Sequence, residues 1–208
     1  MSANAPGAER DQTYPFLSDI AEIRRRARQH IADGAVTLNY AADREVILRL
    51  LNEALATELV CVLRYRRHYF MATGSVAEAI KHEFLKHSQE EQAHADRLAE
   101  RIVQLDGAPN LNPQGMVDRS HSEYAEGETL ADMVEEDLIA ERIAIESYRE
   151  IIQYIADKDT TTRRLFESIL AVEEEHAEEL ASMRQDILRK DRSIADTKRA
   201  VNSTGELQ

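Results

Sequence analysis

Two short segments of the chain carry the same pair of residues, a glutamate followed three positions later by a histidine. Glu91 and His94 form the first pair, and Glu173 and His176 form the second pair, 82 residues further along. Residues three positions apart on an α-helix share one face within one turn. Each pair is therefore predicted to present a carboxylate and an imidazole together, as half of a metal-binding site.

A further glutamate precedes each pair at nearly the same distance. Glu58 lies 33 residues before Glu91, and Glu141 lies 32 residues before Glu173. This spacing places each lone glutamate on the helix before the pair. The sequence thus predicts an internal repeat, in which two pairs of helices each supply two glutamates and one histidine.

Four long helices are predicted to position these side chains, because apolar residues recur at helical spacing in four segments. The predicted helices run from Asp43 to about residue 72, from a cap at Ser75 to Asp106, and over 130–155 and 160–188. The short turns at 73–75 and 157–159 make antiparallel neighbours, whereas residues 107–128 are long enough to cross over along the bundle. The predicted fold is all-α.

The two ends of the chain are expected to lie outside this bundle. A short helix capped by Ser18 is predicted to end near Asp33, after an arm of about 16 residues. Its arginines are expected on a solvated or subunit-contacting face, because residues 1–40 hold five basic and five acidic side chains. The predicted division is an arm and helix over 1–40, the bundle over 41–190, and a polar tail or weak short helix over 191–208.

Composition and charge exclude several classes of protein. The net charge of −13 argues against binding DNA or RNA, which requires a basic face, and suits the collection of cations. The single cysteine, Cys61, and the lack of an apolar signal segment predict a soluble, cytoplasmic protein. No apolar run is long enough for a membrane span.

The four glutamates interrupt apolar stripes and are therefore expected to face the bundle interior. Burying four carboxylates is costly unless each is paired or coordinated. The predicted inward faces carry no lysine or arginine at matching positions, but two divalent cations would balance four carboxylates and two neutral imidazoles. Oxygen and nitrogen ligands without thiolates favour non-haem iron or manganese over a structural zinc.

Several of these segments together resemble bacterioferritin and other ferritin-like di-iron proteins. The similarity extends over about residues 44–188, and the segments that carry it are 51–60, 91–98, 106–111, 137–141 and 173–176. The resemblance implies a ferritin-like four-helix bundle with a di-iron centre. Bacterioferritins ligate haem with a methionine directly after the glutamate of the second helix, where this chain has Gln92, so haem is not expected.

The resemblance also implies a role for each metal ligand. Glu58 and His94 would hold one iron, Glu141 and His176 would hold the other, and Glu91 and Glu173 would bridge them. Manganese is an alternative metal, because this ligand set does not choose between the two.

Other polar residues on the same helix faces are candidates for supporting roles. Tyr65 and Tyr148 each follow a ligand glutamate by seven residues, and each is expected to donate a hydrogen bond to an opposing ligand carboxylate. Tyr65 is counted among the candidate catalytic residues. Asp137 is considered as a partner that orients a ligand histidine. His87 is expected to be partly exposed, with assistance to iron transit as the alternative.

The expected function is that of a ferroxidase, which oxidises Fe(II) to Fe(III) with O2 or H2O2 for iron storage or detoxification. A homo-oligomer is expected, built from dimers into a shell of 12 or 24 subunits. A rubrerythrin-like peroxidase or a manganese catalase stays open as an alternative, the former weakened by the absence of a Cys-x-x-Cys module. A non-enzymatic Dps-like protective shell is disfavoured by the negative charge and the lack of a lysine-rich arm.

Overall fold

The computed structural model describes residues 19–74 and 77–205, and all regular secondary structure within these ranges is helical. The elements are α1 (Ile20–Arg26), the 3₁₀ helix η1 (Ile31–Asp33), α2 (Arg44–Met71), α3 (Ala77–Gln104), α4 (Met116–Arg119), α5 (Leu130–Ile155) and α6 (Thr160–Gly205). Contacts divide the chain into two units after Asn39, and the four long helices all belong to the second unit. Within the described ranges, no helix is both long and apolar enough to cross a membrane.

The long helices begin where short polar side chains cap their free backbone N–H groups. Asp43 accepts hydrogen bonds from the backbone nitrogens of Glu45 and Val46, at 3.1 and 3.2 Å. Thr129 and Asp132 form a reciprocal capping box at the start of α5. Capping satisfies donors that have no partner within the helix, which explains why these helices begin as the sequence predicts. The cap predicted at Ser75 lies outside the described residues.

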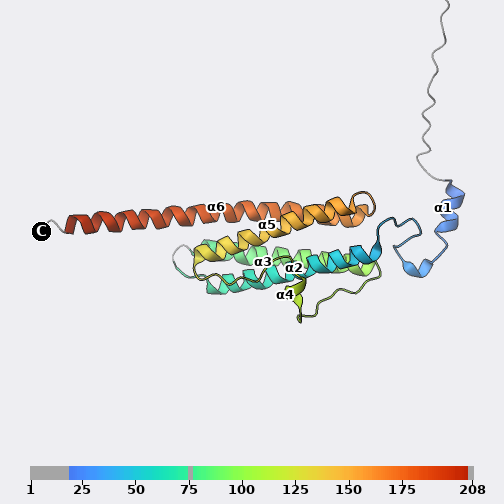
Figure 1. Ribbon diagram of the computed structural model, residues 1–208, viewed down its shortest axis with the longest axis horizontal. Coiled ribbons are helices and arrows are strands. Elements are labelled where there is room, and N and C mark those ends of the chain that lie inside the picture. The colour runs from blue at the N-terminus through green and yellow to red at the C-terminus, as the bar shows by residue number, and fades with distance from the viewer. Residues whose placement is uncertain (1–18, 75–76, 206–208) are drawn as a thin grey trace, which may run out of the picture. The chain divides into compact units, whose positions relative to one another are not determined.

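The four long helices form two antiparallel hairpins, α2 with α3 and α5 with α6 (Figure 1). Each helix turns an apolar stripe inward: Leu51, Leu55, Phe84, Leu98, Val134 and Ile169 are all 0% exposed. Removing such a side chain from water contributes roughly 1.5–3 kcal/mol. The predicted four-helix bundle is confirmed.

The connection between α3 and α5 runs along α2, as predicted for a crossover. Four hydrogen-bonding contacts, in the same order along both segments, join the connection to α2: Asn110 N to Asn52 Oδ1 (2.7 Å), His121 N to Thr57 Oγ1 (2.9 Å), Arg64 Nη1 to Glu123 O (2.8 Å) and His68 Nε2 to Glu126 O (3.0 Å). At its start, Gly107 passes so close to α2 that a Cβ would lie 2.4 Å from Leu48 Cδ2. The crossover is therefore fastened to α2 along much of its length.

Two predicted helix boundaries are wrong. Helix α6 does not end at Leu188 but continues to Gly205, and its C-terminal part extends beyond the rest of the bundle (Figure 1). The physical reason is that residues 189–204 contain no proline or glycine, so nothing stops the helix even where the apolar stripe weakens. At the other end, α1 stops at Arg26, well before Asp33, and His30 adopts a left-handed conformation with φ 52°. The predicted arm and the cap at Ser18 lie outside the described residues, and Asp19 caps α1.

Candidate metal centre

The six predicted metal ligands lie together inside the bundle. Helix α2 contributes one glutamate and α5 another, while α3 and α6 each contribute a glutamate and a histidine. Their exposed fractions are 2% for Glu58, 1% for Glu91, 4% for His94, 1% for Glu141, 1% for Glu173 and 1% for His176. The folded chain thus brings all six side chains to one buried place.

The six side chains form two groups that share Glu91 and Glu173. His94 Nδ1 lies 3.4 Å from Glu58 Oε2, 3.3 Å from Glu91 Oε2 and 3.0 Å from Glu173 Oε1. His176 Nδ1 lies 3.4 Å from Glu91 Oε1, 3.5 Å from Glu173 Oε2 and 3.9 Å from Glu141 Oε1. Each shared carboxylate therefore turns one oxygen toward each histidine, as a carboxylate between two cations does.

Several polar atoms of this cluster are buried without a hydrogen-bond partner among the described residues. These atoms are Glu91 Oε1, both carboxylate oxygens of Glu173, and His176 Nδ1. An unsatisfied buried polar atom costs about 1–3 kcal/mol. In each group of four side chains, the potential ligand atoms all lie within 4.8 Å of one another. Divalent cations with oxygen and nitrogen ligands fit these atoms.

Burial and charge shift the protonation of the ligands. Burial raises the pKa of Glu58 to about 8 and raises the pKa of Glu141 well above its ordinary value. Burial by itself lowers the pKa of His94 and His176, but the surrounding carboxylates favour the protonated rings and raise the two pKa values to about 12 and about 11. Without a cation, the cluster therefore balances its charges by holding protons.

The two tyrosines make the contacts that their positions predict. The Tyr65 hydroxyl donates to Glu141 Oε1, and the Tyr148 hydroxyl donates to Glu58 Oε1. Both tyrosines are 0% exposed. Each bond joins one helical hairpin to the other and holds a ligand carboxylate in a single orientation.

Glu90 contacts the metal centre from its solvent side, which the sequence reasoning missed. Its Oε2 lies 2.9 Å from His176 Nε2, on the far side of the ring from the other ligands. A carboxylate behind a ligand histidine fixes the ring and its tautomer. The sequence signal for this contact was the position of Glu90, which directly precedes the predicted ligand Glu91 in the chain.

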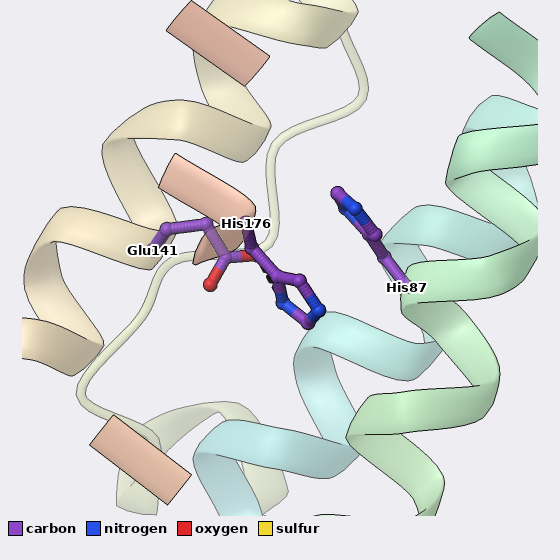
Figure 2. Close-up of side chains that lie close together, drawn as sticks. All are labelled: His87, Glu141 and His176. Atoms are coloured by element: carbon purple, nitrogen blue, oxygen red, sulfur yellow. Dashed lines mark ion pairs between the residues drawn. The ribbon is translucent and has the colours of Figure 1, made fainter. Parts of the chain in front are cut away.

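The expectation that His87 is partly exposed is wrong. His87 is 0% exposed, and its ring stacks on that of His176 with the centroids 4.0 Å apart. Figure 2 shows His87 reaching from α3 toward His176 and Glu141. Both ring nitrogens have partners, since Nδ1 lies 3.2 Å from the Tyr65 hydroxyl and Nε2 lies 2.9 Å from Glu179 Oε2. These partners make its burial possible.

Asp137 does not orient a ligand histidine. Its carboxylate instead lies 2.8 Å from Arg64 Nε and 2.8 Å from His68 Nδ1, and all three side chains are at most 1% exposed. Arg64 is itself a buried arginine of the bundle. Its charge is balanced by Asp137, and in the described part of the chain no lysine or arginine pairs with the four ligand glutamates. Arg64, His68 and Asp137 form a second buried polar network. Its sequence signal was the four-residue spacing of Arg64 and His68, which places both on one face of α2.

Comparison with known proteins places the bundle in a family. The family model for the ferritin-like domain matches residues 48–190. A bacterioferritin from Mycobacterium avium is 34% identical over 135 residues, covering 64% of this chain and 80% of that protein. A bacterioferritin from Rhodobacter capsulatus is 30% identical over 133 residues, covering 64% and 78%.

Solved structures of other proteins show the same fold. A dodecameric thioferritin, the bacterioferritin-related protein from Bacteroides fragilis, superposes with a TM-score of 0.70 at 30% identity, covering 74% of this chain and 92% of that one. Dps from Thermosynechococcus elongatus shares the fold, with a TM-score of 0.64 at 23% identity, covering 66% of this chain and 89% of that one. This chain therefore belongs to the ferritin-like family.

Proposed function

We propose that this protein is a ferroxidase that binds two Fe(II) per chain and oxidises them to Fe(III) with O2 or H2O2, for iron storage or detoxification. The observation that carries the proposal is the sharing of Glu91 and Glu173 by two ligand groups. Bridging carboxylates hold two cations side by side, and two-metal sites have separations of about 3.5–4 Å. Such a pair can deliver two electrons to one oxidant.

The residues have distinct roles in this proposal. Glu58 and His94 hold one Fe(II), and Glu141 and His176 hold the other. The Tyr148 hydroxyl bonds Glu58 Oε1, which leaves Oε2 for the cation beside His94. The hydrogen bond between Glu90 and His176 Nε2 leaves Nδ1 of that ring as the ligand atom.

The overall reaction balances without any change in the protein. Each Fe(II) gives up one electron. When O2 is the oxidant, it takes two electrons and two protons and leaves as H2O2. When H2O2 is the oxidant, its O–O bond breaks, and two electrons and two protons convert it to two molecules of water. The buried tyrosines and carboxylates keep the ligands in place while the charge on the cations rises.

We further propose that the chains assemble into a homo-oligomeric shell. The support comes from the Bacteroides fragilis relative, which is described as dodecameric. Light scattering after size-exclusion chromatography tests this assembly. A particle of 12 or 24 chains is expected, and a monomer or dimer at micromolar concentration would contradict it.

The ferroxidase activity is tested by anaerobic Fe(II) titration, followed by addition of O2 or H2O2 while ferric absorption is recorded. The metal centre is expected to take up two Fe(II) per chain, with oxidation faster than that of free Fe(II). Glu58→Ala and Glu141→Ala each remove a ligand and are expected to abolish the fast phase. Glu174→Ala, which changes a half-exposed glutamate beside Glu173, is the matched control.

Two results would count against ferroxidase activity. One is oxidation no faster than that of free Fe(II), and the other is a fast phase that survives in both ligand variants. Disproportionation of H2O2 by the manganese-loaded protein would then be measured. Oxidation that continues well beyond two Fe(II) per chain would support storage of the product.

A further inference from the structure

A second cluster of a histidine and two carboxylates lies immediately outside the metal centre. Glu83 and His87 come from α3, Glu179 comes from α6, and the potential ligand atoms of the three lie within 4.8 Å of one another. His87 is fully buried, whereas the side chains of Glu83 and Glu179 are 37% and 39% exposed. The cluster therefore has one ligand that faces the bundle interior and two that face solvent.

His87 belongs to this outer cluster and also to an inner one. Its potential ligand atoms lie within 4.8 Å of those of Glu141 and His176, which are both ligands in the metal centre. Its Nε2 points to Glu179 and its Nδ1 to Tyr65, while its ring stacks on the His176 ring. Figure 2 shows the His87 imidazole beside His176 and Glu141. The same imidazole contacts the solvent-facing carboxylate of Glu179, so it connects the outer cluster to the metal centre.

We propose that Glu83, His87 and Glu179 form an outer site for a divalent cation, where Fe(II) binds before it enters the metal centre beside His176. The cation-binding part of this inference stands on the cluster alone, and the entry role rests on the proposed ferroxidase function. Two carboxylates and one imidazole suit Fe(II), Co(II) or Mn(II). With only three protein ligands, the cation keeps coordination positions for water. A site that must release its cation requires such positions.

Without a bound cation, the ammonium group of Lys86 supplies positive charge beside the two carboxylates of this cluster. Its Nζ lies 3.2 Å from Glu179 and 3.8 Å from Glu83, and its side chain is 46% exposed. A lysine this exposed can move its ammonium into water without losing the packing of its stem. The carboxylate of Glu90, which contacts His176, adds a further negative charge near Lys86.

The test is the number of Co(II) ions bound per chain, measured anaerobically by calorimetry and visible absorption. The unaltered protein is expected to bind three, two in the metal centre and one outside. The double variant Glu83→Gln/Glu179→Gln is expected to bind two. The control Glu78→Gln/Glu178→Gln makes the same change in net charge on the same two helices and is expected to bind three. Two ions in the unaltered protein, or three in the outer-site variant, would overturn the site.

A second set of variants separates this site from the proposed function. Glu58→Ala/Glu141→Ala disables the metal centre and is expected to retain one Co(II), which disappears when the outer-site substitutions are added. The outer site would thus be detected even if the metal centre proved not to be a ferroxidase. No retained ion in this background would count against the outer site.

The entry role is tested by stopped-flow mixing of the protein with Fe(II) and O2. At Fe(II) concentrations below saturation, the outer-site variant is expected to oxidise Fe(II) about tenfold more slowly, because the local cation concentration beside Glu83 and Glu179 falls. The final amount oxidised in the first turnover is expected to be unchanged. An unchanged rate would refute entry through this site.

Discussion

Loading the metal centre with divalent cations is expected to release about four protons per chain at pH 7, because the ligands must lose their protons to bind. In the absence of a cation, His94 and His176 carry an additional proton each, since their pKa values are raised to about 12 and about 11. Burial raises the pKa of Glu141 well above its ordinary value, which favours its protonated form as well. Glu58, with a pKa of about 8, is about nine-tenths protonated at pH 7.

The expected number of about four released protons is the sum over these four groups. Burial by itself raises the pKa of Glu91, but the contacts with Glu58, His176 and His94 outweigh it and lower that pKa, so Glu91 is expected to contribute no proton. Because protons leave as cations bind, the apparent affinity rises with pH, about tenfold per pH unit for each proton released. The release is expected to fall toward three as the pH rises through about 8, because Glu58 is half deprotonated at its pKa and loses the rest of its proton about one pH unit higher.

Calorimetric titration with Zn(II), which does not change oxidation state, in buffers of different ionisation enthalpy gives the number of protons released. Glu83→Gln/Glu179→Gln serves as the starting protein, because it confines binding to the metal centre. In this background Glu58→Gln removes one titrating group and is expected to lower the number by about one. Release of no more than one proton per chain at pH 7 would refute the reasoning, because the ligands would then be ionised without a cation.

Two further predictions concern the polar contacts around the centre. Tyr65→Phe and Tyr148→Phe each remove one hydrogen bond to a ligand carboxylate and are expected to weaken Mn(II) binding about 10-fold or more, measured by anaerobic titration; unchanged affinity would mean that the tyrosines only pack. Arg64→Ala leaves Asp137 buried without its cation and is expected to destabilise the protein by about 3–5 kcal/mol in denaturant unfolding. Arg67→Ala, which breaks an exposed pair with Glu126, is the control and is expected to leave the midpoint nearly unchanged; equal effects would contradict the importance of the buried pair.

The helices and the six candidate ligands were predictable from the sequence, because both depend on local spacing. A glutamate three positions before a histidine shares its face on any helix, whatever the rest of the chain does. Caps such as Asp43 and Thr129 act within one turn, so the starts of α2 and α5 were predicted correctly. The end of α6 was missed for the same reason, because residues 189–204 contain no local stop signal and a weakening apolar stripe does not end a helix.

Burial of the other polar residues was decided by tertiary structure alone. His87 is buried because Glu179, from another helix, satisfies its outer nitrogen, and Asp137 turns to Arg64 because the two helices meet there. The energy of a buried polar group depends on whether a partner is within hydrogen-bonding distance, and such partners are distant in sequence. The same holds for the sharing of Glu91 and Glu173 between two histidines, which requires α3 and α6 to be rotated toward each other. The sequence by itself therefore determined which residues lie on the inner faces, and only the packing of the four helices decided which atoms meet.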